Sequence, residues 1–130
     1  MVEINNLSSK KINKVRIEKI VKSFLKKYKI KESTPISLAI IGDAKMKQIN
    51  SLYRKQNKTT DVLSFSNLNE IIINMSQIIR QAKESKKKVL NEFDFILVHG
   101  LLHLAGFNDD TEKNRLKMIE LGEDFLLNLK

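Results

Sequence analysis

The stretch from Val89 to Ala105 constrains the fold most, because it is the most apolar part of the chain and yet contains both of its histidines. We expect a long helix here, ended by Gly106, since a glycine just after a helix readily takes the left-handed conformation that turns the chain away. The run falls short of the ~20 apolar residues that a membrane-spanning helix needs. The sequence therefore predicts a buried helix at the centre of a globular domain.

Helical and strand patterns alternate elsewhere along the chain. Apolar residues at helical spacing predict helices over residues 11–29, from Asp43 to about 53, over 76–85 and from Thr111 onwards. Short runs rich in β-branched residues predict strands at 36–41, 62–65 and 70–73, after an alternating start at Val2 and Ile4. The last helix is expected to direct these side chains inward: Leu116, Ile119, Leu126 and Leu127.

These elements predict an α+β fold with about four strands in a mixed sheet and about five helices packed on it. A length of 130 residues fits one domain, so we expect residues 1–130 to form a single domain. The absence of cysteine excludes a disulfide scaffold and any cysteine-based zinc site. The first residues lack the apolar stretch of a signal peptide, and a cytoplasmic location without membrane contact is expected.

Positive charge is concentrated in the first half of the chain. Residues 1–65 contain 15 basic and 5 acidic residues, whereas residues 66–130 contain 9 and 10. A one-sided positive field attracts polyanions such as nucleic acid. The bias towards lysine is equally explained by an AT-rich coding sequence, so the charge permits nucleic-acid binding without requiring it.

The two histidines, His99 and His103, are four residues apart in the predicted apolar helix. At this spacing their imidazoles project from adjacent turns on the same side, so both can ligate one zinc ion. A turn at Gly106 would bring Asp109 towards the same ion. Two partly exposed histidines paired by chance are the alternative, but unpartnered imidazoles in an apolar stretch would be costly to bury. The pattern therefore favours a metal site on the helix that ends near Gly106.

The same histidine spacing occurs in zinc peptidases, where a glutamate directly after the first histidine acts as general base. That position is Gly100 here, which has no side chain. Peptide hydrolysis is therefore not expected.

Three blocks of sequence read HGLLHLAGFND over residues 99–109, NSLYR followed by KTTDVLSF over 50–65, and EIIIN over 70–74. Together they closely resemble the signature of the YbeY family, bacterial metal-dependent endoribonucleases of ribosomal RNA maturation. The resemblance implies a single-strand-preferring endoribonuclease that acts in ribosomal RNA maturation and ribosome quality control. It implies ribosomal RNA and ribosomal particles as partners, with no DNA and no membrane.

The resemblance also assigns roles to individual residues. It implies that His99, His103 and Asp109 hold the metal, with Asp109 standing where the family has a third histidine. A carboxylate is an accepted zinc ligand, so Zn²⁺ remains the expected cofactor, although the added negative charge permits another divalent metal. Asp110 is a competing ligand. Arg54 is expected to bind the substrate phosphate through its planar fork, and Arg54 and His99 are the expected catalytic residues.

Other residues near these blocks admit more than one interpretation. Asp61 could orient Arg54 or a ligating histidine, or it could cap a turn. Tyr53 and Phe65 could stack on a base, although packing in the core is the simpler expectation. Asp94 and Glu92 are expected on a solvated helix face.

Two other functions remain open from the sequence. A non-catalytic protein that binds RNA or the ribosome through a degenerate metal site would show salt-dependent RNA binding without turnover. A zinc hydrolase acting on a small phosphoester is the other alternative.

Overall fold

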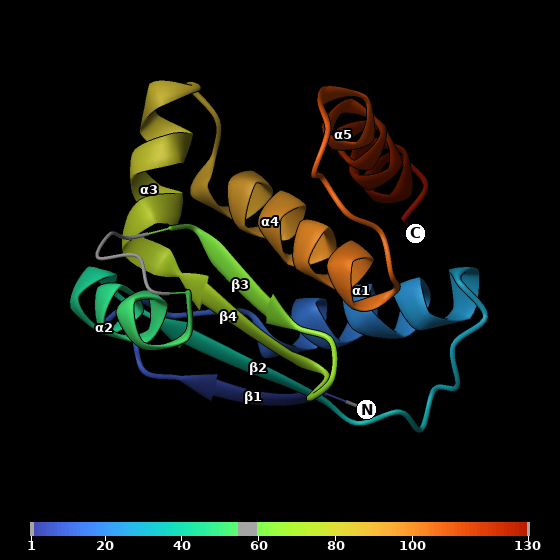
Figure 1. The fold of residues 1–130 in the computed structure, drawn as a ribbon, viewed down its shortest axis with the longest axis horizontal. Coiled ribbons are helices and arrows are strands. Elements are labelled where there is room, and N and C mark those ends of the chain that lie inside the picture. The colour runs from blue at the N-terminus through green and yellow to red at the C-terminus, as the bar shows by residue number, and fades with distance from the viewer. Residues whose placement is uncertain (1, 55–59, 130) are drawn as a thin grey trace.

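The fold is built on a four-stranded mixed sheet with the strand order β1-β2-β4-β3 (Figure 1). The computed structural model describes residues 2–54 and 60–129. Strands β1 (Val2–Asn6), β2 (Ile36–Ile41) and β4 (Glu70–Asn74) run parallel to one another. The short strand β3 (Val62–Phe65) pairs antiparallel with β4 and forms one edge of the sheet. The two strands predicted at 62–65 and 70–73 thus form an antiparallel hairpin.

The described residues form five helices between and after the strands. Their bounds are α1 (Lys14–Lys27), α2 (Asp43–Arg54), α3 (Met75–Glu84), α4 (Val89–Leu104) and α5 (Glu112–Leu127). Side-chain caps at Asn13, Asn74 and Thr111 accept hydrogen bonds from the first turns of α1, α3 and α5, which satisfies amides that a helix start leaves unpaired. The single α+β domain with a mixed sheet is thus confirmed. No helix within the described ranges is both long and apolar enough to cross a membrane.

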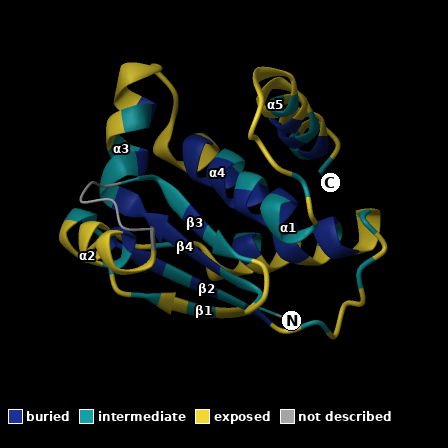
Figure 2. Ribbon diagram, viewed as in Figure 1, coloured by how far each residue is buried: buried dark blue, intermediate teal, exposed yellow. Residues whose placement is uncertain are grey.

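Successive side chains of a strand point to opposite faces of the sheet, so the buried apolar residues form one cluster on each face. In β2, Leu38 and Ile40 pack with the large cluster formed by α1, α3, α4 and α5, whereas Ile41 faces a small second cluster. Helix α2 closes that second cluster through Met46 and Ile49. Figure 2 shows the buried residues on the surfaces where α4 and the strands meet. Helix α4 is therefore the central helix that its apolar sequence predicts.

The inward face of α5 was predicted wrongly at two positions. Leu116 is 53% exposed and Leu127 is 82% exposed. Instead, α5 buries Met118, Gly122 and Phe125, which follow one another at intervals of four and three residues. The contact stripe is thus rotated around the helix axis, and Gly122 within it faces Phe95 and Val98 on α4.

The expectation that Glu92 and Asp94 lie on a solvated face of α4 is also wrong, because both residues are buried. Gln81 donates a hydrogen bond to Glu92, at 3.0 Å. One oxygen of Asp94 accepts from Nε of Arg16 at 2.8 Å and lies 2.7 Å from Nη2 of the same side chain. The other oxygen is buried and has no hydrogen-bond partner among the described residues. Arg16 on α1 therefore pairs with the charge of Asp94, whereas Glu92 has the Gln81 amide and, at 3.8 Å, the ammonium group of Lys87. None of these partners can be identified from periodicity.

Arg16→Ala is expected to destabilise the protein by about 3 kcal/mol at neutral pH, since it leaves the buried Asp94 charge unpaired. Burial already raises the pKa of Asp94, and Arg16 offsets part of that rise, so the pKa rises further in the variant. A carboxyl whose folded-state pKa is raised loses its stabilising contribution as the pH climbs through that pKa. The deficit should therefore be smaller at pH 5 than at pH 8 in urea unfolding experiments. A deficit that does not depend on pH would contradict this account of Asp94.

Candidate metal centre

Gly100 allows α4 to lie directly against β3 and β4. A side-chain carbon added at Gly100 would lie 3.0 Å from a methyl group of Ile71 and 3.3 Å from Val62 and from the hydroxyl of Ser64. That hydroxyl donates to the carbonyl oxygen of Gly100, at 3.1 Å. The contact fixes the rotation of α4 on the sheet and directs His99 and His103, on either side of Gly100, along the edge formed by β3.

The end of α4 turns the chain back towards its own histidines. The amides of Gly106 and Phe107 donate to the carbonyls of His103 and Leu102, which is the bonding pattern of a Schellman motif. Gly106 has φ +102°, a conformation that side chains rarely adopt. The turn directs the Phe107 carbonyl oxygen at Nδ1 of His103, 3.1 Å away. The predicted glycine turn is therefore confirmed.

Replacing Gly106 by alanine is expected to cost about 1–2 kcal/mol of stability, because a β-carbon is strained at φ +102°. The strain should loosen the Phe107 carbonyl from His103 and weaken metal binding ~10-fold, as loss of an orienting partner does at other sites. Chemical denaturation and metal titration of the same preparation measure both effects. Unchanged metal affinity would mean that the turn does not orient the His103 ring.

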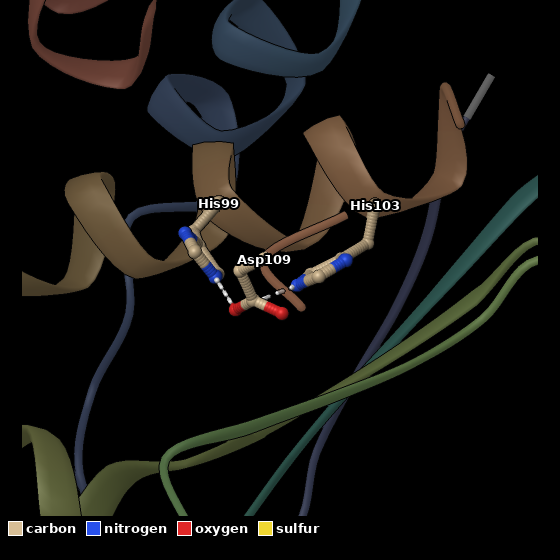
Figure 3. A group of neighbouring side chains, drawn as sticks. All are labelled: His99, His103 and Asp109. Carbon is tan, nitrogen blue, oxygen red and sulfur yellow. Dashed lines mark ion pairs between the residues drawn. The ribbon is translucent and has the colours of Figure 1, made fainter. Parts of the chain in front are cut away.

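Three ligand atoms meet beside this turn (Figure 3). Nε2 of His99 lies 3.5 Å from Oδ2 of Asp109, and Nε2 of His103 lies 3.6 Å from the same oxygen. All three ligand atoms lie within 4.8 Å of one another. Ligands bound tetrahedrally at ~2.1 Å around zinc are separated by about 3.4 Å, so the cluster needs little adjustment to hold an ion.

The hydrogen bond of His103 tests whether these residues suit a cation. A carbonyl oxygen only accepts, so Nδ1 of His103 must carry the hydrogen that points at Phe107. In the neutral ring the lone pair is then on Nε2, which faces a carboxylate oxygen of Asp109. Two acceptors repel unless a proton or a metal ion lies between them. The donor set and its orientation therefore fit a divalent metal.

His99 is suited to metal binding by its protonation state. Burial lowers its pKa below the usual value and the nearby His103 lowers it further, against the carboxylates of Asp109 and Asp61, which raise it. A lowered pKa keeps the imidazole neutral at physiological pH, and only the neutral ring ligates a metal.

The three residues open onto a polar cavity of about 410 Å³. The wall opposite α4 is formed by β3 and the residues that lead into it, including Thr60, Asp61 and Ser64. Asp110 lines the cavity too, but it is not part of the three-residue cluster. The cavity thus offers hydroxyl and carboxylate groups around the candidate metal site.

The other residues singled out in the sequence have different placements. Arg54 is the last residue of α2, and its side chain lies outside the described part of the structure. Tyr53 is 69% exposed, so the expectation that it packs in the core is wrong. It contacts Phe65 edge-to-face at 5.7 Å, and Phe65 packs against the small cluster under α2.

Sequence reasoning missed the groups that shape the turn around Asp109. The side-chain oxygen of Asn108 accepts hydrogen bonds from the Asp110 amide at 3.3 Å and from Asn114 on α5 at 3.0 Å. Asparagine commonly organises tight turns in this way, which is the one signal that the sequence offered. The Phe107 carbonyl carries no sequence signal, because every residue has one.

Comparison with known proteins gives a family for this arrangement. The sequence model of the family described as "Endoribonuclease YbeY" matches residues 3–130. The chain belongs to the YbeY endoribonuclease family. The resemblance of the three sequence blocks is thereby confirmed, and the His-His-Asp cluster is consistent with a metal site of this family.

Relatives named Endoribonuclease YbeY match nearly the whole chain. The protein of Thermodesulfovibrio yellowstonii is 39% identical over 145 residues, covering 95% of this chain and 90% of the relative. That of Phytoplasma australiense is 33% identical, covering 96% and 92%. A protein of Thermotoga maritima with a known solution structure has the same fold, with a TM-score of 0.74, 22% identity, and coverage of 97% of this chain and 87% of that one. The match to these proteins thus extends over nearly the whole of this chain.

Proposed function

We propose that this protein is a metal-dependent endoribonuclease that cleaves single-stranded ribosomal RNA during ribosomal RNA maturation and ribosome quality control. His99, His103 and Asp109 hold the metal, which is Zn²⁺ or a related divalent cation. Arg54 binds the substrate phosphate, and Arg54 and His99 are the catalytic residues. Residues 1–130 form one endoribonuclease domain that works in the cytoplasm on ribosomal particles.

The observation that carries the proposal is the orientation of His103 by the Phe107 carbonyl. It leaves the Nε2 lone pair of His103 facing the Asp109 carboxylate at 3.6 Å, an arrangement that a cation stabilises. Membership of the YbeY family supplies the reaction class.

In the proposed reaction, the protein binds an RNA phosphate over the polar cavity. A divalent cation on the three ligands would supply Lewis-acid polarisation of a phosphoryl oxygen. The guanidinium of Arg54 matches two phosphate oxygens and neutralises their charge, while the hydroxyls of Thr60 and Ser64 lie in the cavity wall. The Phe107 carbonyl holds the ring of His103 in place, and burial keeps His99 neutral.

The positive first half of the chain supports RNA as the substrate, since 15 of the 24 basic residues lie within residues 1–65. Association with RNA through such charges weakens steeply as salt is raised. Binding to ribosomal particles should therefore be measured at physiological ionic strength.

The test is cleavage of a single-stranded oligonucleotide taken from ribosomal RNA by the untagged protein, beside a duplex and a DNA strand of the same sequence. We expect about one equivalent of metal by elemental analysis, and cleavage of the single-stranded RNA alone. A chelator should stop cleavage and added Zn²⁺ or Mn²⁺ should restore it. Cleavage that persists after complete metal removal would refute the metal-dependent mechanism.

Salt-dependent RNA binding without metal or turnover would instead support the non-catalytic alternative. In that case Asp109→His, which creates a third histidine ligand, should raise metal affinity sharply. Tight metal binding by the native protein would exclude a degenerate site.

A further inference from the structure

Asn74, the last residue of β4, is fully buried and joins four segments of the chain. Its side-chain amide nitrogen donates to Oδ1 of Asp43 at 2.8 Å and to the carbonyl oxygen of Thr60 at 3.1 Å. Its side-chain oxygen accepts from the Gln77 amide, which caps α3. Its backbone amide donates to the Asp61 carbonyl at 2.9 Å. Capping of α3 requires only the side-chain oxygen. The two bonds from the amide nitrogen instead connect Asn74 to Asp43 and Thr60.

The two acceptors of that nitrogen are the two ends of one segment. Asp43 is the first residue of α2, and Thr60 lies two residues before β3 begins. Arg54, which ends α2, lies between them. One buried carboxamide therefore bonds to Asp43 and to Thr60, which lie before and after the proposed phosphate-binding arginine in the sequence.

The first of these attachment points is itself held rigidly. Arg80 on α3 donates from Nη1 to Oδ2 of Asp43 at 2.6 Å and from Nη2 to Oδ1 at 2.8 Å. A two-pronged charge-assisted pair fixes the orientation of a carboxylate as well as its position. The nitrogen of Asn74 thus donates to a carboxylate whose orientation Arg80 supports from the other side.

Helix α2 transmits this constraint along its length. Its 12 residues span about 18 Å, so a small rotation at Asp43 becomes a larger displacement at Arg54. A misplacement of ~1 Å in a group that positions substrate can lower a rate ~100-fold. The geometry at the start of α2 therefore matters for phosphate binding at its end.

We infer that Asn74 is a positioning residue for RNA cleavage, which acts through Arg54 by holding Asp43 at the start of α2 and Thr60 ahead of β3. The inference rests on the proposed function. It predicts that the amide nitrogen of Asn74, and not only its capping oxygen, is needed for full activity.

Asn74→Asp separates these two parts of the side chain. The variant keeps an oxygen that can cap α3 but replaces the donor with a second oxygen, which faces the Asp43 carboxylate and the Thr60 carbonyl. We expect kcat/KM for single-stranded RNA to fall at least tenfold at a temperature at which circular dichroism shows a folded protein. Zinc affinity should stay within about threefold of the native value. Activity equal to the native protein would overturn the inference.

Asn13→Asp is the matched control. Asn13 caps α1 through the same kind of bond, to the Arg16 amide at 3.1 Å, and does not line the polar cavity. Its variant should retain native kcat/KM. A similar loss in both variants would show that an asparagine-to-aspartate change at a helix cap, rather than loss of the Asn74 amide donor, causes the defect.

A double-mutant cycle with Arg54→Ala tests the route of the effect. If Asn74 acts through Arg54, Asn74→Asp should lower kcat/KM less than twofold when Arg54 is already absent. An equal loss in both backgrounds would overturn the inference. If Asn74→Asp does not fold, Arg80→Ala replaces it in the cycle, because this variant removes the guanidinium that orients Asp43. It should lower kcat/KM about threefold, and this loss should also disappear in the Arg54→Ala background.

The cycle also separates this inference from the proposed function. A native protein that cleaves no RNA would refute the proposed function. The same four proteins of the cycle would then be compared by their Kd for single-stranded RNA. Weaker binding by Asn74→Asp only while Arg54 is present would support the positioning role, and additive losses would refute it.

Discussion

His99→Ala is expected to remove the bound metal and to lower RNA cleavage by at least ~1,000-fold while the protein stays folded. Among the described residues, three candidate ligands meet in the cluster, so the loss of Nε2 of His99 would leave an ion with His103 and Asp109. Loss of even an orienting partner costs ~10–100-fold in metal affinity, and loss of a ligand should cost more. Elemental analysis, metal titration and single-turnover cleavage measure the three quantities.

Asn91→Ala is a suitable control for this experiment, because Asn91 is an exposed residue of the same helix and does not line the polar cavity. It should retain metal and activity. Native cleavage rates in His99→Ala would refute the assignment of the site, and unfolding of the variant would move the test to His103→Ala, whose side chain is more exposed, at 28% against 16%.

Gly100→Glu is expected to destabilise the fold by at least ~4 kcal/mol. Even the first side-chain carbon would lie 3.0 Å from Ile71 and 3.3 Å from Val62, and the remaining atoms would force a charge between α4 and the sheet. The variant places a glutamate directly after the first histidine, as in zinc peptidases. It should give little folded protein and no peptide hydrolysis, as measured by denaturant unfolding and a peptidase assay.

Gly122→Ala is the matched control, since a side-chain carbon at Gly122 would contact the Phe95 ring at an ordinary 3.5 Å. Removing a glycine from the interior of a helix should stabilise this variant by about 0.5–1 kcal/mol. A folded Gly100→Glu protein of native stability would contradict the described packing of α4 on β3.

The element order could be predicted because each element carries its own local signal. Apolar periodicity predicts the helices, and runs such as Ile36–Ile41 predict strands. Which residues of a helix face inward was less predictable. The buried residues of α5 are those in line with Gly122, which faces α4. The buried Asp94 depends on Arg16, which lies 78 residues away in the sequence. Such pairings exist only in three dimensions.

The candidate site could be predicted for a different reason. Its three ligands lie within 11 residues of sequence, so helix spacing and one glycine turn bring them together without any knowledge of the fold. The cavity wall could not be predicted in this way, because Thr60 and Asp61 reach the histidines only through the packing of β3 on α4. The orientation of His103 depends on a backbone carbonyl, which no residue type indicates.

That backbone contact has an evolutionary consequence. Because a main-chain oxygen orients His103 and a glycine shapes the turn, neither depends on which side chain occupies position 109. The codons for aspartate and histidine differ by a single base. Exchange between aspartate and histidine at position 109 therefore needs one mutational step and leaves the contact that orients the His103 ring in place.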